Sequence, residues 1–362
     1  MEIMGGLKGQ VSAEFWKNKR VYLTGHTGFK GSWLSLWLQE MGAIVKGYSL
    51  APYTSTSLFE EARVFEGMDS EIGDIRDLEL VTKSMTSFDP DILIHMAAQP
   101  LVRLSYSSPV DTYATNVMGT IHVLEAARQC KKLKSIVAIT TDKCYENKEW
   151  SWGYRENEPM GGHDPYSSSK GCCELLIASY RKSFFNDTNS PALASVRAGN
   201  VIGGGDWSDD RLIPDILKAF EKSNPVIVRN PLSTRPWQHV LEPLSGYLVL
   251  AEELYKNGDQ FAEGWNFGPK DEDCQSVEWI LNTMIKTWGE GASWQLDRNS
   301  NPHEAGFLKL DCSKAAQELK WLPQWNLEFT LNSIVDWHKS WINSADMKKQ
   351  CLKEIKLYVN KL

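Results

Sequence analysis

A tyrosine and a lysine stand four residues apart in the sequence, as Tyr166 and Lys170 of Tyr-Ser-Ser-Ser-Lys. At helical spacing the phenol and the ammonium lie on one face, and the three small residues between them leave room for a ligand. A free phenol titrates near ~10 and is a poor base at neutral pH, but a neighbouring ammonium favours the phenolate. We therefore predict that Tyr166 removes a proton from an alcohol during its oxidation and that Lys170 tunes it, rather than that both are ordinary surface residues.

A glycine-rich segment, Gly-His-Thr-Gly-Phe-Lys-Gly at 25–31, directly follows the apolar run 20–24. Glycines at this spacing let the backbone approach a pyrophosphate at a helix N-terminus and let the helix pack close to a sheet. Such a triplet alone is weak support, because loops are rich in glycine. Followed by the Tyr–Lys pair, it predicts a nicotinamide-dependent enzyme whose cofactor contacts Gly25, Thr27, Gly28, Phe29, Lys30 and Gly31.

Composition narrows the class of protein. Of 362 residues, 42% are hydrophobic and 23% charged, and there is no apolar run of membrane-spanning length. The net charge of −7 argues against a nucleic-acid partner but permits an anionic substrate held by local arginines. The first ten residues lack the pattern of a signal peptide, so we expect a cytoplasmic protein with no membrane partner. Seven scattered cysteines without Cys-x-x-Cys spacing predict reduced thiols and no metal site.

Short β-branched runs alternate with helical stretches through the first half of the chain, which predicts a Rossmann-type, doubly wound parallel α/β sheet. The expected strands are Val21–Thr24, Ile44–Tyr48, Ile92–Met96, Ser135–Thr140, Ala192–Val196 and, later in the chain, Gly264–Gly268. Helices are expected at 166–185 and 241–256. The long polar stretch 144–165 predicts a loop that covers or borders the site.

The regular alternation fails from Gly203, where glycines are followed by a Pro- and Arg-rich segment. We therefore expect a second, smaller mixed α/β lobe that binds the substrate. The predicted units are a dinucleotide-binding domain at 14–200 with 236–270, the substrate-binding lobe at 201–235 with 271–345, and a solvated C-terminal surface helix at 346–362. Trp207 and Trp237 stand among polar and glycine residues, where their rings could line a ligand pocket.

The residues after the second and third expected strands bear on the choice of cofactor. Tyr48-Ser49-Leu50 offers neither an acid for an adenosine ribose nor a clear arginine for a 2′-phosphate, so NAD is favoured over NADP without being fixed. After a third strand, Asp74 suits the adenine edge, with Ile75 beside it. Asp77 could instead simply cap the helix that follows.

Five segments together resemble the extended short-chain dehydrogenases/reductases, and among them the sugar-nucleotide 4,6-dehydratases. They are 25–31, 95–99, 141–142, 166–170 and 197–203, and the resemblance runs from about Phe15 to Trp337. It implies a retained NAD in the first domain, a nucleotide-sugar substrate in the lobe, and a homodimer or homotetramer. The further cofactor residues that it implies are Ala97, Ala98, Gln99, Asn116 and Thr140, besides Tyr166 and Lys170. Three segments, 25–31, 141–143 and 234–240, are most similar to dehydratases of a CDP-activated hexose, which act in deoxysugar and O-antigen precursor biosynthesis.

The resemblance also implies a catalytic set. Thr141 donates a hydrogen bond to the sugar oxygen that Tyr166 deprotonates, so that C4 becomes a ketone and the C5 proton becomes acidic. Asp142 is the acid at the leaving C6 hydroxyl, and hydride returned to C6 gives a 4-dehydro-6-deoxy sugar. Thymidine-nucleotide relatives carry a glutamate next, as the base at C5, where this chain has Lys143. A lysine could serve only with a depressed pKa; otherwise Tyr166 or a water takes the proton.

The diphosphate of a nucleotide sugar needs cations, and arginine forks suit phosphate oxygens better than an ammonium does. The expected substrate contacts, in order of preference, are Arg235, Asn200 and Arg211, followed by Arg229 and the loop residue His303. A 4-epimerase or decarboxylase on the same scaffold is the main alternative, but an epimerase needs no acid such as Asp142. A sensor that binds NAD without turnover is a remote alternative, disfavoured by the intact set of Thr141, Tyr166 and Lys170.

Overall fold

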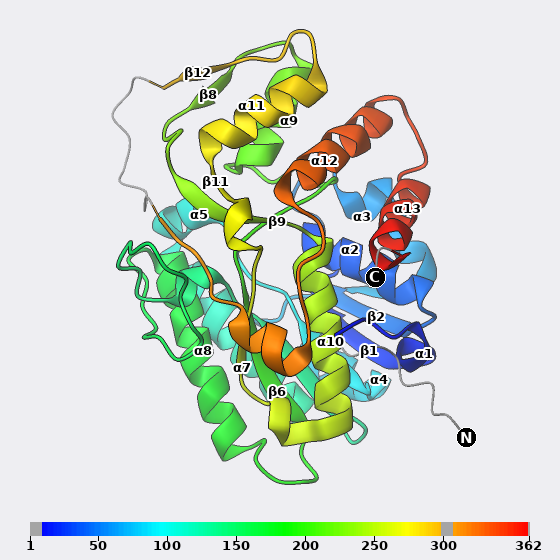
Figure 1. Cartoon of the computed structure of the whole chain (residues 1–362). Coiled ribbons are helices and arrows are strands. Elements are labelled where there is room, and N and C mark those ends of the chain that lie inside the picture. The colour runs from blue at the N-terminus through cyan, green and yellow to red at the C-terminus, as the bar shows by residue number, and fades with distance from the viewer. Residues whose placement is uncertain (1–8, 298–306, 361–362) are drawn as a thin grey trace, which may run out of the picture.

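The computed structural model describes residues 9–297 and 307–360. Its centre is a seven-stranded sheet in which every pair of neighbouring strands is parallel (Figure 1). Across the sheet the strands are β10 (Gly264–Phe267), β6 (Ala192–Ala198), β5 (Ser135–Ile139), β4 (Ile92–His95), β1 (Arg20–Thr24), β2 (Ile44–Ser49) and β3 (Asp69–Ile72). The strand order reverses between β1 and β4, and ligands of open α/β sheets bind at such a switch point, beyond the carboxyl ends of the strands.

The strands form at the apolar runs because both faces of a parallel sheet are buried. All five residues of β5 and all seven of β6 are buried. Successive residues serve opposite faces: Val21 and Leu23 of β1 belong to one hydrophobic core, and Tyr22 belongs to another. The predicted Rossmann-type sheet is confirmed, and β10 returns to pair with β6 as expected.

Helices cover both faces of the sheet. The first core contains α2 (Phe29–Glu40), α10 (Leu241–Asn257) and α13 (Met347–Asn360). The opposite core contains α4 (Leu78–Phe88), α7 (Gly119–Ala127) and α8 (Pro165–Ser183). Shorter helices are α1 (Ala13–Trp16), α3 (Leu58–Glu61), α5 (Val102–Ser107) and α6 (Pro109–Tyr113). Within the described ranges, no helix is both long and apolar enough to cross a membrane.

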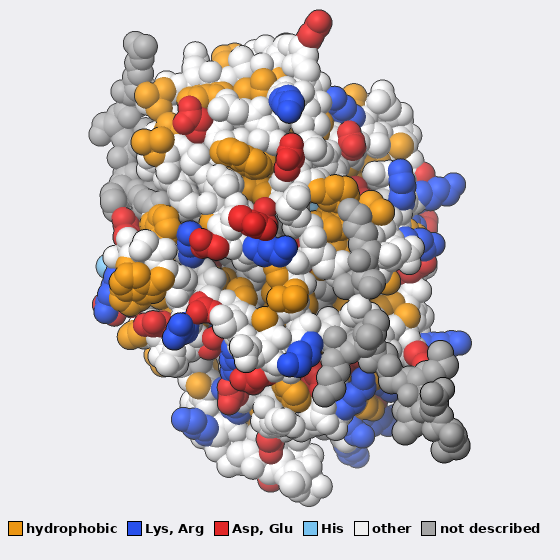
Figure 2. All heavy atoms as spheres, viewed as in Figure 1, with side chains coloured by type: hydrophobic (Ala, Val, Ile, Leu, Met, Phe, Trp, Pro, Cys, Tyr) orange, Lys and Arg blue, Asp and Glu red, His pale blue; other side chains and the backbone are white. Residues whose placement is uncertain are grey.

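A smaller mixed α/β lobe follows β6, as predicted, and lies at the top of Figure 1. It holds a three-stranded sheet of β11 (Cys274–Ser276), β9 (Thr234–His239) and β7 (Asn200–Ile202), and a two-stranded sheet of β12 (Trp294–Leu296) and β8 (Val226–Val228). Helices α9 (Leu212–Glu221), α11 (Val277–Trp288) and α12 (Leu327–Ile342) complete its core. Figure 2 shows acidic and basic side chains intermixed over the visible face, so a bound anion depends on local arginines.

Packing departs from the sequence-based expectations at several places. Trp237 is only 4% exposed inside the core of the lobe, where its indole nitrogen donates to the Gln275 carbonyl at 3.1 Å. The prediction that it lines a ligand pocket is therefore wrong. The ring of the half-buried Trp207 packs against Trp337, and its place in a pocket stays a prediction. The segment 315–325 contributes to the first core rather than to that of the lobe. The exact limits of the two units stay a prediction.

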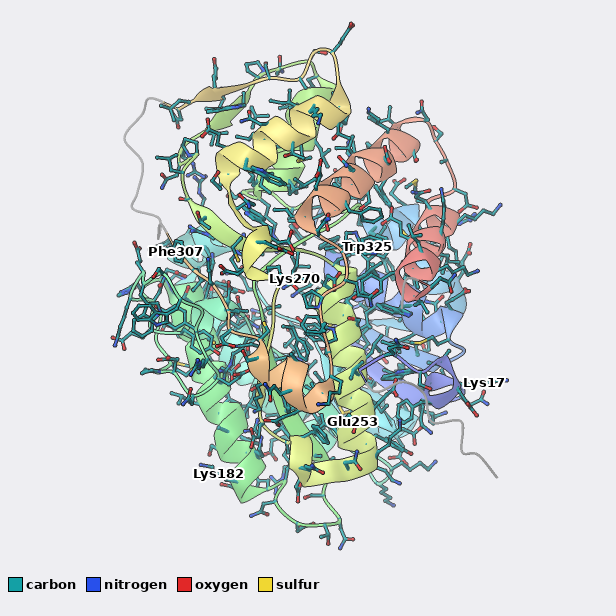
Figure 3. All side chains as sticks on the ribbon, viewed as in Figure 1. Lys17, Lys182, Glu253, Lys270, Phe307 and Trp325 are labelled. Carbon is teal, nitrogen blue, oxygen red and sulfur yellow. The ribbon has the colours of Figure 1, made fainter. Side chains whose placement is uncertain are left out.

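Helix α13 is not the solvated helix that its lysines predict. It packs on α2, and its apolar residues recur at helical spacing on one face, which places Met347, Cys351, Ile355 and Tyr358 in the first core. The Tyr358 hydroxyl donates to the Glu242 carboxylate at 2.7 Å. Its ring lies 5.4 Å from that of Trp325, which is labelled in Figure 3 at the junction of α10 and α12. The lysines occupy the remaining, exposed face.

A buried carboxyl on α13 faces a buried histidine at the end of β9. Glu354 Oε2 lies 3.6 Å from His239 Nε2, and both side chains are nearly or fully inaccessible. Burial raises the pKa of Glu354 to about 8 and lowers the pKa of His239 to about 3. Both groups are therefore neutral at neutral pH, so the contact is a dipolar one and not an ion pair.

This pair predicts a pH-dependent stability. Because the folded-state pKa of Glu354 lies above its ordinary range, the unfolded chain loses the proton first, and stability falls as pH rises towards about 8. The variant Glu354→Gln, which cannot ionise, should lose fewer degrees of melting temperature than the native protein between about pH 5 and about pH 8. The exposed Glu318→Gln is the matched control. Equal pH slopes for the native protein and Glu354→Gln would contradict the assignment.

Candidate active site

The glycine-rich turn between β1 and α2 leaves no room for side chains at two positions. Gly25 has a φ of +81°, and a Cβ there would lie 2.8 Å from the Ala97 backbone nitrogen. A Cβ on Gly31 would overlap the Gly25 carbonyl. Gly28 caps α2 without a side-chain hydrogen bond, and a Cβ there would meet only the Gly25 oxygen at 3.5 Å. The turn thus fits a dinucleotide, because the helix N-terminus stays open to a pyrophosphate.

The other residues of this turn have different surroundings. The Thr27 hydroxyl donates to the Leu50 carbonyl at 2.8 Å, which joins the turn to the end of β2. Phe29 packs against the first core. Burial lowers the pKa of Lys30 to about 7, with Arg211 and Lys170 acting in the same direction. The Lys30 ammonium therefore belongs to a cationic group within the site, in keeping with its predicted place beside phosphates.

The predicted adenine contact follows β3. Asp74 accepts two hydrogen bonds from the Arg76 side chain, at 2.7 and 2.9 Å. Burial acts to raise the pKa of Asp74, but the bonds from Arg76 outweigh it and the net shift is downward. Ile75 is buried, and its carbonyl lies 3.1 Å from His122 Nδ1. Asp77 caps α4 by accepting from the Leu80 backbone nitrogen at 3.0 Å, which confirms the capping alternative for that residue.

The end of β4 is tied to helix α8 through one buried amide. Residues 97–99 lie one residue beyond the end of the strand, and the Gln99 backbone nitrogen donates to Asn116 Oδ1 at 2.8 Å. Asn116 Nδ2 donates to the Ser169 hydroxyl at 2.9 Å and to the Gln99 carbonyl at 3.1 Å. Asn116 lies in a π-helical turn, Ala114–Met118, a feature that often marks functional sites. Ala97, Ala98, Gln99 and Asn116 are thus grouped at the carboxyl edge of the sheet.

The tyrosine, lysine and threonine predicted to act in catalysis converge between β5 and α8. The Thr141 side chain lies close enough to the Tyr166 phenol to lower its pKa, and Lys170 donates to the Ile139 carbonyl at 3.2 Å. Burial raises the pKa of Tyr166, and Thr141 and the charge of Arg211 offset this only in part. Arg211 is the cation that acts on the phenol here, and the tuning of Tyr166 by Lys170 stays a prediction. Burial also lowers the pKa of Lys170.

Asp142 has the surroundings of a proton donor. It is 2% exposed, and its Oδ1 accepts from the Thr141 hydroxyl at 3.0 Å. Oδ2 is buried without a partner among the residues that the structure describes. Burial raises the pKa of this carboxyl, against the opposing charges of Lys143 and Arg235. A carboxyl with a raised pKa and one unused oxygen suits proton donation to a leaving group.

The predicted substrate contacts are only partly brought together. Arg235, on β9, is close enough to Asp142 to oppose its raised pKa, and Arg211 acts in the same way on Tyr166. Asn200 begins β7, in register with Trp237 of β9. Arg229 follows β8 in the two-stranded sheet and stays a prediction. His303 lies outside the described residues.

Two further residues at the site were not found from the sequence. The Ser105 hydroxyl of α5 accepts from the Tyr166 backbone nitrogen at 3.1 Å and so holds the first turn of α8. Tyr53 lies near Ser208 and Arg211; burial raises its pKa, and these two neighbours act to lower it. Both contacts join segments far apart in the chain, and no local pattern in the sequence indicates either.

Comparison with known proteins assigns the chain to a family. The model of the family described as GDP-mannose 4,6 dehydratase matches residues 23–334. A protein of Salmonella typhimurium named CDP-glucose 4,6-dehydratase is 60% identical over 354 residues, which cover 97% of this chain and 99% of that protein. The chain therefore belongs to the GDP-mannose 4,6 dehydratase family.

Solved structures resemble the whole fold. A UDP-glucose 4-epimerase from Stenotrophomonas maltophilia, solved with NAD, superposes with a TM-score of 0.77 at 21% identity, covering 91% of this chain and 100% of that one. A dTDP-glucose 4,6-dehydratase from Bacillus anthracis, also with NAD, has a TM-score of 0.74 at 19% identity, covering 91% and 99%. At such identities the likeness speaks for the fold alone.

Proposed function

We propose that the protein is an NAD-dependent hydro-lyase that converts CDP-D-glucose to CDP-4-dehydro-6-deoxy-D-glucose and water, a step of deoxysugar biosynthesis. The observation that carries this function is the buried, partly unpartnered carboxyl of Asp142 beside the Thr141–Tyr166 pair. The CDP-glucose 4,6-dehydratase of Salmonella typhimurium, 60% identical over nearly the full length of both chains, supports the choice of nucleotide.

NAD fits the turn that Gly25 and Gly31 keep free of side chains. When bound, it supplies an acceptor for the hydride of C4 and the donor that reduces C6. In our proposal the N-terminus of α2 and Lys30 hold its pyrophosphate, and Lys170 holds the nicotinamide ribose. The remaining predicted contacts are Thr27, Phe29, Asp74, Ile75, Ala97, Ala98, Gln99, Asn116 and Thr140.

The two chemical stages use groups from different elements. Tyr166 on α8 takes the proton of the C4 hydroxyl, while Thr141, which lies close to the phenol, donates a hydrogen bond to the same sugar oxygen. Asp142, after β5, then protonates the C6 oxygen as it leaves. The base at C5 stays open between Lys143, Tyr166 and water. An epimerase would have no use for an acid at the C6 oxygen, so Asp142 favours dehydration.

The nucleotide sugar is proposed to lie between the two units. Arg235 and Arg211 would meet its diphosphate, since both act electrostatically on the catalytic residues. Asn200 at the start of β7 is the third candidate. The division of labour proposed above follows: 14–200 with 236–270 for NAD, and 201–235 with 271–345 for the sugar nucleotide.

We also propose that the protein is a homodimer or homotetramer. An apolar groove between α6 and α8 is lined by Pro109, Val110, Tyr113, Ala114, Val117, Met118 and Cys172. Val110 is 80% exposed there, and contiguous apolar surface of this kind favours association. The measured molar mass in solution tests this proposal. A cytoplasmic location is proposed as well, because all seven cysteines are free thiols, as suits a reducing compartment.

A substrate comparison tests the function. The purified enzyme should convert CDP-glucose to an alkali-sensitive 4-keto sugar without added reductant, and it should act on dTDP-, UDP- and GDP-glucose at least ~10-fold less efficiently in kcat/KM. Product formation is followed by alkaline absorbance and mass spectrometry. Equal rates with the glucose derivative of another nucleotide would overturn the choice of CDP. A product that keeps its C6 hydroxyl and differs from the substrate only in configuration at C4 would indicate an epimerase.

A further inference from the structure

A buried ion pair lies beneath the catalytic strand end. Arg197 of β6 binds Glu174 of α8 through two parallel bonds, Nη2 to Oε2 at 2.8 Å and Nε to Oε1 at 2.9 Å. The two side chains are 5% and 4% exposed. Burial would raise the pKa of Glu174, but the charge and hydrogen bonds of Arg197 lower it, so the carboxylate is ionised.

The Glu174 carboxylate also holds the end of β5. The Thr140 hydroxyl donates to its Oε1, and the Ser195 hydroxyl donates to Oε2 at 2.7 Å. Thr140 immediately precedes Thr141 and Asp142, and Glu174 is one helical turn beyond Lys170. One carboxylate therefore fixes the strand end that carries the acid to the helix that carries the tyrosine and lysine.

The guanidinium holds the chain on the other side of the acid. Arg197 Nη1 donates to the Tyr145 hydroxyl at 2.6 Å and to the Glu156 carbonyl at 3.0 Å. The Tyr145 hydroxyl in turn donates to Asn266 Oδ1 at 2.8 Å. Asp142 thus lies between two anchors, Thr140 and Tyr145, and both depend on the same ion pair.

Stability alone does not account for such a pair. Removing two charges from water costs about as much as their attraction returns, and apolar replacements of buried pairs are often neutral or stabilising. A fully hydrogen-bonded network does, however, select one arrangement of the elements that it joins. The proposed reaction needs one fixed arrangement, because its proton donor, Asp142, follows β5, whereas the base at the C4 hydroxyl, Tyr166, lies on α8.

We propose that Glu174 and Arg197 are a positioning pair that sets Asp142 relative to Tyr166 and Lys170, and so couples loss of the C6 hydroxyl to oxidation at C4. The inference rests on the proposed function. Oxidation at C4 depends chiefly on Tyr166 and Lys170 of α8, with a supporting hydrogen bond from Thr141 of the strand end. Elimination depends on Asp142, so a displacement of the strand end should slow elimination more than oxidation.

The variant Glu174→Gln keeps the shape of the side chain and removes its charge. We expect kcat for CDP-glucose to fall by at least ~10-fold while KM changes by less than ~3-fold, because a displacement on the order of 1 Å impairs catalysis more than binding. Reduced nicotinamide should accumulate during turnover and be visible in the near-ultraviolet absorbance, since oxidation continues and elimination lags. Thr140→Val removes the hydroxyl bond to Glu174, together with the bond of the same hydroxyl to the Val196 carbonyl, and should show the same pattern more weakly. Because Thr140 is also a proposed NAD contact, the affinity of this variant for NAD is measured alongside.

Glu242→Gln is the matched control. Glu242 is likewise buried and accepts from the Trp325 nitrogen and the Tyr358 hydroxyl, both at 2.7 Å, but it lies on α10 beneath α13. The variant Glu242→Gln should have a lower melting temperature than the native protein, but it should not accumulate reduced cofactor during turnover. The positioning role is overturned if Glu174→Gln and Thr140→Val, both folded, show no more reduced cofactor than this control. The native enzyme is assayed in parallel. If it does not dehydrate CDP-glucose, the proposed function is wrong, whatever the variants show; if it does, the variants test the positioning role alone.

Discussion

Tyr166→Phe should abolish turnover of CDP-glucose while leaving its binding almost unchanged. The substitution removes the phenolic proton acceptor and keeps the ring that packs between β5 and α8, and general base catalysis is worth about 10²- to 10⁴-fold in rate. Steady-state kinetics and calorimetric titration with CDP-glucose measure the two quantities. Tyr180→Phe, a tyrosine farther along the same helix, controls for loss of a hydroxyl from α8. A rate for Tyr166→Phe above a few per cent of native would remove Tyr166 from its role.

Asp142→Asn should separate the two stages of the reaction. An amide of the same shape cannot donate the proton that the C6 oxygen needs, so we expect elimination to slow by about 10²- to 10⁴-fold while C4 oxidation continues. Mixing the variant with CDP-glucose in a single turnover should leave the cofactor reduced, as followed by absorbance. Asp77→Asn is a suitable control, because asparagine caps a helix as well as aspartate does.

The raised pKa of Asp142 gives this prediction a pH dependence. The acid is active only when protonated, so kcat of the native enzyme should fall as pH rises through that raised value. The pH profile of kcat for Asp142→Asn should lack this limb. Native-like kcat in the variant, or a defect confined to C4 oxidation, would contradict the assignment of Asp142.

Most of the fold follows from local patterns in the sequence. Runs such as 135–140 and 192–196 are short, apolar and β-branched, and their burial on both faces of the sheet is what such composition indicates. The prediction of a solvated C-terminal helix rested on the many lysines of α13. The helical spacing of Met347, Cys351 and Tyr358 instead determines that one face of α13 packs on the first core. Trp237 misled for the opposite reason: polar neighbours in sequence do not exclude a buried ring.

The active site, like the fold, was predictable where local motifs determine it. Local motifs indicated the glycine turn and the Tyr166–Lys170 pair, because the spacing within one turn or one helix determines how those side chains meet. Contacts between distant segments were not accessible, such as the Ser105 hydroxyl at the Tyr166 nitrogen or Arg197 at Glu174. Burial was not accessible from the sequence either, because it depends on the assembled fold, and it raises the pKa of Tyr166.

Internal hydride transfer is the central claim, and an isotope crossover experiment tests it most directly. CDP-glucose labelled with deuterium at C4 and with carbon-13 throughout the hexose is mixed with unlabelled CDP-glucose and converted by the enzyme without added NAD. Mass spectrometry of the product should find deuterium at C6, and only in molecules that carry carbon-13. Deuterium in the unlabelled hexose, or a requirement for stoichiometric NAD, would contradict the account and leave a simple dehydrogenase.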